Sequence, residues 1–269
     1  MSGIGGGRWR RWVAAALIVA GLEAVSAAAW PSSAAAADQI PTATSFPGVP
    51  AVGAVFPDGV ASPHTCTGSV IRGAGPDVVL TAAHCLSGTG QGVVFAPGYH
   101  DGAAPYGLWT VSAVYADPRW VSAQDPQHDY AFLVLEPRRR AGHTTHLHDL
   151  VAGYLLGTAP DPGREVSVIA YAQGLNDRPI ICTTATYRFS GYPAFDCHGF
   201  VLGTSGAPWL TWTSGSFTVR GTIGGLHQGG CYEYTSYSSA FDRDTLATYQ
   251  RAQRGTAPDD LPVPGGDGC

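Results

Sequence analysis

The chain has 269 residues, of which 45% are hydrophobic, 13% are charged and 36 are glycines. This composition suits a buried core connected by many turns, and it excludes a disordered or coiled-coil protein. The formal net charge is −5 and all 15 basic residues are arginines. We therefore expect no binding to nucleic acid, because proteins of that class usually carry a basic stripe.

The first residues have the order of a secretory signal peptide. Three arginines within residues 8–11 precede an apolar run, and small residues follow it. We expect residues 1–37 to form the signal peptide, with cleavage after Ala29 or after Ala37, and residues 38–50 to form a pro-segment or N-terminal arm. An uncleaved membrane anchor is the alternative, but the apolar run is near the minimum spanning length and contains a glutamate. The sequence thus predicts a secreted protein without membrane attachment after cleavage.

From about residue 50 the chain consists of short runs rich in Val, Ile, Thr and aromatic residues, separated by Gly, Pro and Asp. This pattern predicts an antiparallel all-β protein. A polar stretch, 137–150, separates two sets of strands, so we expect one β lobe over 51–150 and a second over 151–241. The predicted strands are 52–56, 65–72, 77–84, 108–116 and 129–136, then 165–172, 180–189, 207–212, 217–226 and 237–241.

One helix is predicted near the end of the chain, over 242–253. Asp242 or Asp244 is its candidate N-cap, since a carboxylate there accepts from the first free N–H groups. A tail rich in Pro and Gly, 254–269, follows.

The six cysteines form an even set, which fits disulfides in an exported protein. There is no C-x-x-C pair, so a structural zinc site is not expected. Pairing of neighbours along the sequence suggests three consecutive bridges, although counting alone leaves the connectivity open. In chain order the cysteines are Cys66, Cys85, Cys182, Cys197, Cys231 and Cys269.

Three residues have the chemistry of acyl transfer. His84 ends a predicted strand and is a candidate general base, although a lone histidine there is more often structural. Asp129 starts an alternating apolar strand, where a buried carboxylate needs a partner such as an imidazole N–H. Asp125 is a weaker competitor. Ser205 stands in a glycine-rich turn and is a nucleophile only if a base takes its proton.

Together these segments resemble a known family. "TAAHC", "DYAFLVL" and "GTSGAP", in that order, are similar to the chymotrypsin-like serine endopeptidases, over roughly residues 50–245. The resemblance implies two antiparallel six-stranded β-barrels with a C-terminal helix. It implies His84 as base, Asp129 as orienting acid and Ser205 as nucleophile, with an oxyanion hole from Gly203 and Ser205. It also matches Cys66 and Cys85 to the disulfide beside the histidine.

The sequence departs from the digestive members of that family at two positions. Thr204 stands where they carry the aspartate that pairs with a new N-terminus, so we expect activation without a buried ammonium. Gly199 stands six positions before Ser205, where enzymes that cut after Lys or Arg carry an aspartate. A preference for basic side chains is therefore disfavoured, although Asp196 lies close in sequence.

The segment "IGGLHQGG" (223–230) is similar to a pocket strand of the bacterial glutamyl endopeptidases. His227 matches a histidine that receives the substrate carboxylate there, which suggests cleavage after acidic residues. Satisfying backbone groups is an equally good reading of His227, because Phe200 replaces a small hydroxyl residue. Gly229 is expected to leave room for a substrate strand.

No cofactor or metal is predicted. The cluster His143, His146, His148 and Asp149 offers metal-ligand types, but a polar loop explains it equally well. We expect a monomeric serine endopeptidase that acts on peptides or proteins. The alternatives are a catalytically silent binding module on the same fold, or an esterase.

Overall fold

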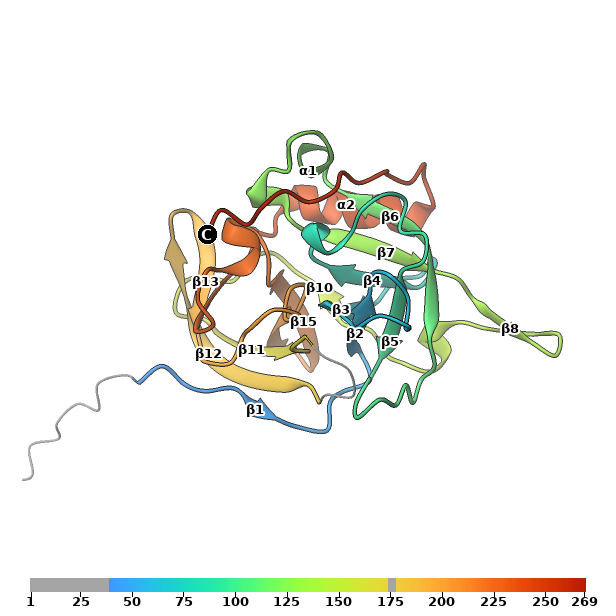
Figure 1. Ribbon diagram of the computed structural model, residues 1–269, viewed down its shortest axis with the longest axis horizontal. Helices are drawn as coiled ribbons and strands as arrows, with labels where there is room; N and C mark the ends of the chain where they lie inside the picture. Colours follow the sequence, from blue (N-terminus) through green and yellow to red (C-terminus); the bar gives the residue numbers. More distant parts are fainter. Residues whose placement is uncertain (1–38, 174–177) are drawn as a thin grey trace, which may run out of the picture. The chain divides into compact units, whose positions relative to one another are not determined.

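The computed structural model describes residues 39–173 and 178–269. Strands dominate these residues, in two large sheets and one two-stranded hairpin, and two α-helices accompany them (Figure 1). None of the described residues belongs to a helix long and apolar enough to cross a membrane. The predicted signal peptide, residues 1–37, lies outside the described residues.

Six strands of the first half close into an antiparallel barrel, as the resemblance implies. Around the barrel they follow the order β2-β3-β4-β7-β6-β5, and β5 pairs with β2 to close the ring. The sequence pattern missed β5 because this short strand ends at Pro97, next to Gly98. The strands are β2 (Val52–Phe56), β3 (Cys66–Ile71), β4 (Val78–Thr81), β5 (Val94–Pro97), β6 (Trp109–Ala116) and β7 (Ala131–Leu135).

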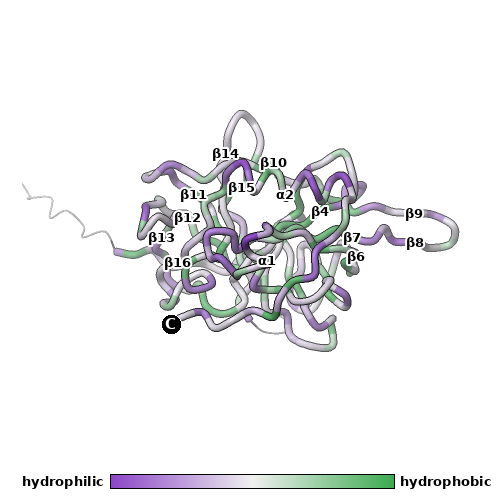
Figure 2. The backbone as a smooth tube through the Cα atoms, turned by 90° about the horizontal axis from the view of Figure 1, so that it is seen from above, coloured by the Kyte–Doolittle hydropathy of each residue, from purple (hydrophilic) through white to green (hydrophobic). Residues whose placement is uncertain are grey.

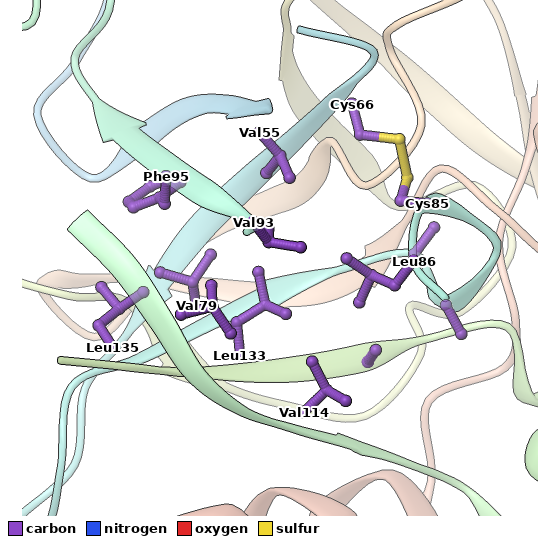
Figure 3. Close-up of a cluster of buried hydrophobic side chains, with 14 of the residues drawn as sticks. Val55, Cys66, Val79, Cys85, Leu86, Val93, Phe95, Val114, Leu133 and Leu135 are labelled. Carbon is purple, nitrogen blue, oxygen red and sulfur yellow. A yellow bond between two sulfur atoms is a disulfide. The ribbon is translucent and has the colours of Figure 1, made fainter. Parts of the chain in front are cut away.

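Alternate side chains of these strands fill the barrel. Val55, Phe95 and Leu133 come from three different strands, are fully buried and lie in one cluster (Figure 3). Burial of a side chain of this size stabilises the fold by about 1.5–3 kcal/mol. The disulfide Cys66–Cys85 lies at the edge of the same cluster and ties β3 to the turn after β4 (Figure 3).

The second half forms an open sheet of eight strands, not the expected closed six-stranded barrel. Its main path has the order β10-β15-β14-β11-β12-β13-β16, and β1 from the N-terminal arm pairs with β12. The strands are β1 (Thr44–Ser45), β10 (Leu155–Leu156), β11 (Glu165–Ala170), β12 (Ile180–Phe189), β13 (Tyr192–Asp196), β14 (Pro208–Thr213), β15 (Ser216–Thr222) and β16 (Thr235–Tyr237).

The ring stays open because β16 is too short to build a ladder with β15. A backbone bond from Gly224 N to Tyr237 O at 3.0 Å links the chain just after β15 to the end of β16. Beside it the Ser238 hydroxyl, rather than a carbonyl, accepts from Thr222 N at 3.0 Å. A side chain thus takes the place of the ladder that the resemblance led us to expect.

The polar stretch between the halves is a hairpin rather than a loop. It consists of β8 (Arg138–Arg140) and β9 (His143–Thr145), and it projects from the first barrel (Figure 1). Most of its length is hydrophilic (Figure 2). The Arg138 guanidinium lies over the Trp109 ring, 5.3 Å from its centroid, so this arginine is not merely solvated.

Two α-helices are formed. The helix α1 (Pro118–Ala123), which the sequence pattern missed, is short and capped by Asp117. The predicted C-terminal helix is α2 (Arg243–Arg254), and the Asp242 side chain caps it by accepting from two backbone N–H groups.

The tail after α2 returns across the molecule towards the second sheet (Figure 1). Leu261 and Gly88 exchange backbone hydrogen bonds of 2.8 and 2.9 Å. Gly265 N then donates to Gln124 Oε1 at 2.7 Å. The disulfide of Cys269 fixes the end of the tail beside the second sheet.

Candidate active site

Asp129 is a fully buried carboxylate just before β7. It follows a 3₁₀ turn, Pro126–His128, and it is 0% exposed. Its oxygens accept from His84 N at 2.9 Å and from Gly225 N at 2.8 Å, and Oδ2 lies 2.7 Å from His84 Nδ1. Such donors are needed because an unpaired charge away from water is costly. The predicted base and acid are therefore in direct contact.

The competing carboxylate of Asp125 is engaged elsewhere. It caps the same 3₁₀ turn, accepting from Gln127 N and from His128 Nδ1 at 3.0 Å each. It makes no hydrogen bond to His84 in the described part of the chain.

The contact with Asp129 determines which nitrogen of His84 carries a proton. An ionised carboxylate only accepts hydrogen bonds, so Nδ1 carries a proton and Nε2 presents a lone pair. His84 lies in a 3₁₀ turn, Ala83–Cys85, and not at the end of the strand predicted over 77–84, because β4 stops at Thr81.

Ser205 lies in a tight loop that the first barrel holds in place. Thr67 of β3 donates from its backbone N to Ser205 O at 2.7 Å and from its hydroxyl to Gly203 O at 3.1 Å. Gly203 and Gly206 have φ values of 96° and 83°, which glycine adopts without a steric penalty. A Cβ on Gly203 would fall on the Gln173 backbone, and one on Gly206 would fall on Thr67 O.

The peptide N–H groups of Gly203 and Ser205 donate no hydrogen bond within the part of the chain that the structure describes. Leu202 O accepts from Gln173 N at 2.6 Å. Because the C=O and N–H of a trans peptide point in opposite directions, this bond turns the Gly203 N–H away from Gln173. Both N–H groups are available to an anionic oxygen.

One pocket of about 520 Å³ has both His84 and Ser205 in its lining. Within the described residues Ser205 Oγ makes no hydrogen bond to His84 Nε2. Such bonds are often long in the absence of substrate and tighten in the reacting complex. The structure thus gathers His84, Asp129 and Ser205 at the junction of the two halves.

Some of the predicted pocket residues line the pocket and others lie outside it. Phe200 and Gly229 line the pocket, and Phe200 packs edge-on against Phe195, with ring centroids 5.1 Å apart. Gly199 is not in the lining, and its N–H donates to Glu233 Oε2 at 2.6 Å. Asp196 is also outside the lining, because its carboxylate accepts from neighbouring side chains of the second sheet.

His227 lines the pocket, but the strand predicted around it is wrong. β15 ends at Thr222, and Leu226–Gly229 form a turn in which His227 and Gln228 both have a φ of 52°. The tail holds this turn: His227 Nδ1 donates to Asp267 O at 3.0 Å, and the Gln228 amide donates to the carbonyl of Gly265. His227 therefore does not present an extended strand edge with which a substrate strand could pair.

Three disulfides are present, and they join neighbours along the sequence. The third fastens the tail beside the pocket, and Cys269 and Asp267 belong to the pocket lining. The bridges are Cys66–Cys85, Cys182–Cys197 and Cys231–Cys269.

The histidine-rich stretch is built around a buried aspartate that the sequence did not single out. Asp77 Oδ1 lies 2.7 Å from His148 Nδ1, and Asp77 Oδ2 lies 3.6 Å from His146 Nδ1. Both oxygens of Asp77 also accept backbone N–H groups of this stretch. His143 is in β9, and Asp149 caps a 3₁₀ turn, so the four suggested ligands do not converge.

Sequence reasoning missed three residues of the site. Thr67 contacts the serine loop, and Glu233 and Asp267 contribute to the pocket lining. Only Thr67 carries a signal, since it follows Cys66 in a predicted strand. Nothing in the spacing of the other two indicates the pocket.

Comparisons with known proteins agree with this geometry. Residues 66–218 match the family described as a trypsin-like peptidase domain. Among solved structures, the protease Anisep from Arthrobacter nicotinovorans is 25% identical, with a TM-score of 0.67, covering 79% of this chain and 100% of its own.

Two further solved structures share the fold. A thermostable serine protease, AL20, from an extremophilic microorganism is 24% identical, with a TM-score of 0.63, covering 76% of this chain and 97% of its own. A Glu endopeptidase is 16% identical, with a TM-score of 0.57, covering 79% and 98%. No curated protein matches the chain by sequence.

Proposed function

Because the chain belongs to the family of trypsin-like peptidase domains, we propose that it is a secreted serine endopeptidase that acts on peptides or proteins as a monomer. One observation carries the proposal: a buried Asp129 holds His84 with its Nε2 lone pair free, and His84 and Ser205 share one pocket. This is the arrangement that makes a serine hydroxyl nucleophilic.

In the first half of the reaction, Ser205 Oγ attacks the carbonyl carbon of the scissile bond while His84 Nε2 takes the hydroxyl proton. Base catalysis of this kind contributes about 10²–10⁴-fold. The buried carboxylate of Asp129 stabilises the imidazolium that forms. The carbonyl oxygen becomes an anion and accepts from the N–H groups of Gly203 and Ser205, each worth about 10²–10³-fold.

The second half releases the products. His84 Nε2 gives its proton to the leaving amine, the C–N bond breaks, and an ester on Ser205 remains. Water then attacks this ester with His84 again as base, and the tetrahedral intermediate expels Ser205 Oγ, which regains its proton. No cofactor takes part in these steps.

A fluorophosphonate tests the proposal directly, because it phosphonylates only an activated serine. We expect stoichiometric labelling of the secreted protein at Ser205, no labelling of Ser205→Ala, and cleavage of a peptide library by the wild type alone. Wild-type protein that is folded, yet labels no faster than Ser205→Ala, would refute the proposal.

The two alternatives make different predictions. A silent binding module on this fold has no need of a paired His84 and of available N–H groups at Gly203 and Ser205, so we rank it second. An esterase would label equally well but would hydrolyse p-nitrophenyl esters while leaving all library peptides intact.

Activation is proposed not to need a new N-terminus. Thr204 is 3% exposed, and its hydroxyl donates to Val201 O at 2.7 Å, so its side chain offers no carboxylate to an ammonium group. Val52 is fully buried within β2, and its N–H bonds to Val49 O. Mass spectrometry of active protein should find no obligatory cut immediately before Val52.

Cleavage after acidic residues, which His227 suggests, remains a prediction. It requires a particular protonation state of the His227 ring. Its Nδ1 proton is already donated to Asp267 O, so only a protonated ring can donate from Nε2 to a substrate carboxylate. The other charged groups around the pocket work against such a substrate.

A further inference from the structure

Two histidines and a buried aspartate lie together where the connection between the two halves begins. Asp77 directly precedes β4 and its side chain is 2% exposed, and His146 and His148 follow β9. Asp77 Oδ1 lies 2.7 Å from His148 Nδ1, and Asp77 Oδ2 lies 3.6 Å from His146 Nδ1. One ligand atom from each residue falls within 4.8 Å of the other two. The three side chains therefore converge, although the peptidase steps use none of them.

The backbone that carries the two histidines is already held in place. Leu147, between them, is fully buried in the cluster of the first barrel. Asp77 accepts from Leu147 N at 2.7 Å and from His148 N at 2.9 Å. Asp149 accepts from His146 N at 2.8 Å. Because the main chain is fixed, little conformational entropy is left to lose when these side chains bind a ligand.

The two imidazoles present the same nitrogen to the same carboxylate. Their rings are nearly parallel, with centroids 5.0 Å apart and an angle of 18° between the planes. Two ligand atoms of a tetrahedral zinc site, each about 2.0–2.2 Å from the ion, lie roughly 3.4 Å apart. The two distances from Asp77 to the Nδ1 atoms, 2.7 and 3.6 Å, lie on either side of that value. Small side-chain rotations are thus enough to place an ion between the three.

The donor set is that of a transition-metal ion. Imidazole nitrogen and carboxylate oxygen together suit Zn²⁺ and its neighbours, whereas Ca²⁺ and Mg²⁺ prefer oxygen alone. When Nδ1 of His148 binds a metal, its ring proton moves to Nε2, and Asp149 Oδ1 lies 3.8 Å from that atom. A carboxylate beside the outer nitrogen is the usual partner of a ligating histidine.

Charge and access also suit a cation. Among the described residues, Asp77 forms ion pairs with His146 and His148 and with no arginine. Arg72 lines a cavity of about 180 Å³ together with Asp77 and His148, without an ion pair to the aspartate in the described part of the chain. The side chains of His146 and His148 are 40% and 53% exposed, so an ion reaches them from solvent.

From these contacts we propose that Asp77, His146 and His148 form a binding site for Zn²⁺ or a similar divalent transition-metal ion, with water completing the coordination. The site is structural and does not depend on the peptidase function. It forms only in the folded chain, because Asp77 and His148 are 71 positions apart. At a free ion concentration of 100 times Kd, the ratio of unfolded to folded protein should fall about 100-fold.

Calorimetric titration of metal-stripped, tag-free protein with ZnCl₂ tests the site. We expect one ion per chain, and a weakening by more than the roughly tenfold lost with an outer-shell partner in both His146→Gln and His148→Gln. The matched control is His143→Gln, which removes an exposed histidine of β9 outside the cluster and should leave Kd unchanged. Asp77→Asn should weaken binding as well, and the histidine variants decide the question if that variant does not fold.

Urea unfolding gives a second readout. Zn²⁺ should raise the urea midpoint of the wild type and of His143→Gln, and it should not raise that of the double variant His146→Gln/His148→Gln. CaCl₂ at the same concentration should leave all three midpoints unchanged.

Each outcome decides a definite question. Wild-type protein that binds no zinc, or zinc binding that both histidine variants retain, overturns the site. Equal weakening in His143→Gln also overturns it, because the stretch then binds metal without the observed geometry. Zinc that binds at the site but does not shift the midpoint refutes the stabilising role. Fluorophosphonate labelling at Ser205 is measured separately, so failure of the metal site leaves the peptidase function untouched.

Discussion

The hydroxyl of Thr67 offers a sharp test of how the first barrel positions the nucleophile. It donates to Gly203 O at 3.1 Å and accepts from Tyr171 N at 2.9 Å, and the residue is fully buried. Thr67→Val keeps the shape but removes both bonds. The Thr67 N–H bond to Ser205 O is a backbone bond, and the substitution preserves it.

The expected magnitudes follow from these contacts. A buried polar group that loses its partner costs about 1–3 kcal/mol, so Thr67→Val should lower the free energy of unfolding by about 2–4 kcal/mol. Without the hydroxyl, the Gly203–Thr204 peptide loses a restraint. This peptide lies between the two peptides that carry the Gly203 and Ser205 N–H groups, so the aim of these donors should worsen. Complete loss of one such donor costs about 10²–10³-fold, and we expect a fall of roughly 10- to 100-fold in kcat, with KM changed less than about twofold.

The assay combines urea unfolding with kcat and KM normalised to fluorophosphonate-titrated sites. Thr67→Ser retains the hydroxyl and should recover most of kcat. The control is Thr186→Val, since Thr186 is also a buried donor to backbone carbonyls but does not line the pocket. It should lose stability without losing kcat. If Thr67→Val is destabilised while its kcat per titrated site equals that of the wild type, the hydroxyl has no positioning role.

Three further outcomes are expected. Asp129→Asn should lower kcat about 10⁴-fold in a folded protein, since an amide does not fix the His84 tautomer; an unchanged kcat contradicts the pairing. Gly203→Ala should cost more unfolding free energy than Gly215→Ala, because both glycines have positive φ but only the first is crowded; equal losses argue against the steric account. Replacing Cys231 and Cys269 by Ser should lower stability by about 2–4 kcal/mol and raise KM, measured by urea unfolding and peptide kinetics; an unchanged KM removes the tail from the pocket.

The catalytic motifs could be predicted because each is short and local. β2 has the predicted bounds, 52–56, because every one of its residues is buried between two partner strands and bounded by turns. A partner for Asp129 was expected because a buried carboxylate must be hydrogen-bonded. His84 lies in a turn after β4 and not at the predicted strand end. The structure then brings them together across 45 positions of sequence.

The parts that could not be predicted depend on contacts between distant segments. Thr67 meets Gly203 across 136 positions, and neither residue carries a pattern that points to the other. The turn at His227 replaces a strand because Gly225 N is drawn to Asp129 and the tail binds the side chains that follow. The second barrel was expected from a resemblance, but the sheet stays open, because β16 is short and a serine hydroxyl rather than a ladder bonds to the end of β15.

The tail determines when the wall of the pocket is complete. Asp267 and Cys269 complete the pocket wall, and their attachment to Cys231 requires oxidation. A ribosome must therefore have passed residue 269, and the nascent protein must have met an oxidant, before this wall exists. In a reducing environment this bridge would not persist, so the tail would lose its covalent link to Cys231 while the contact between His84 and Asp129 is unaffected.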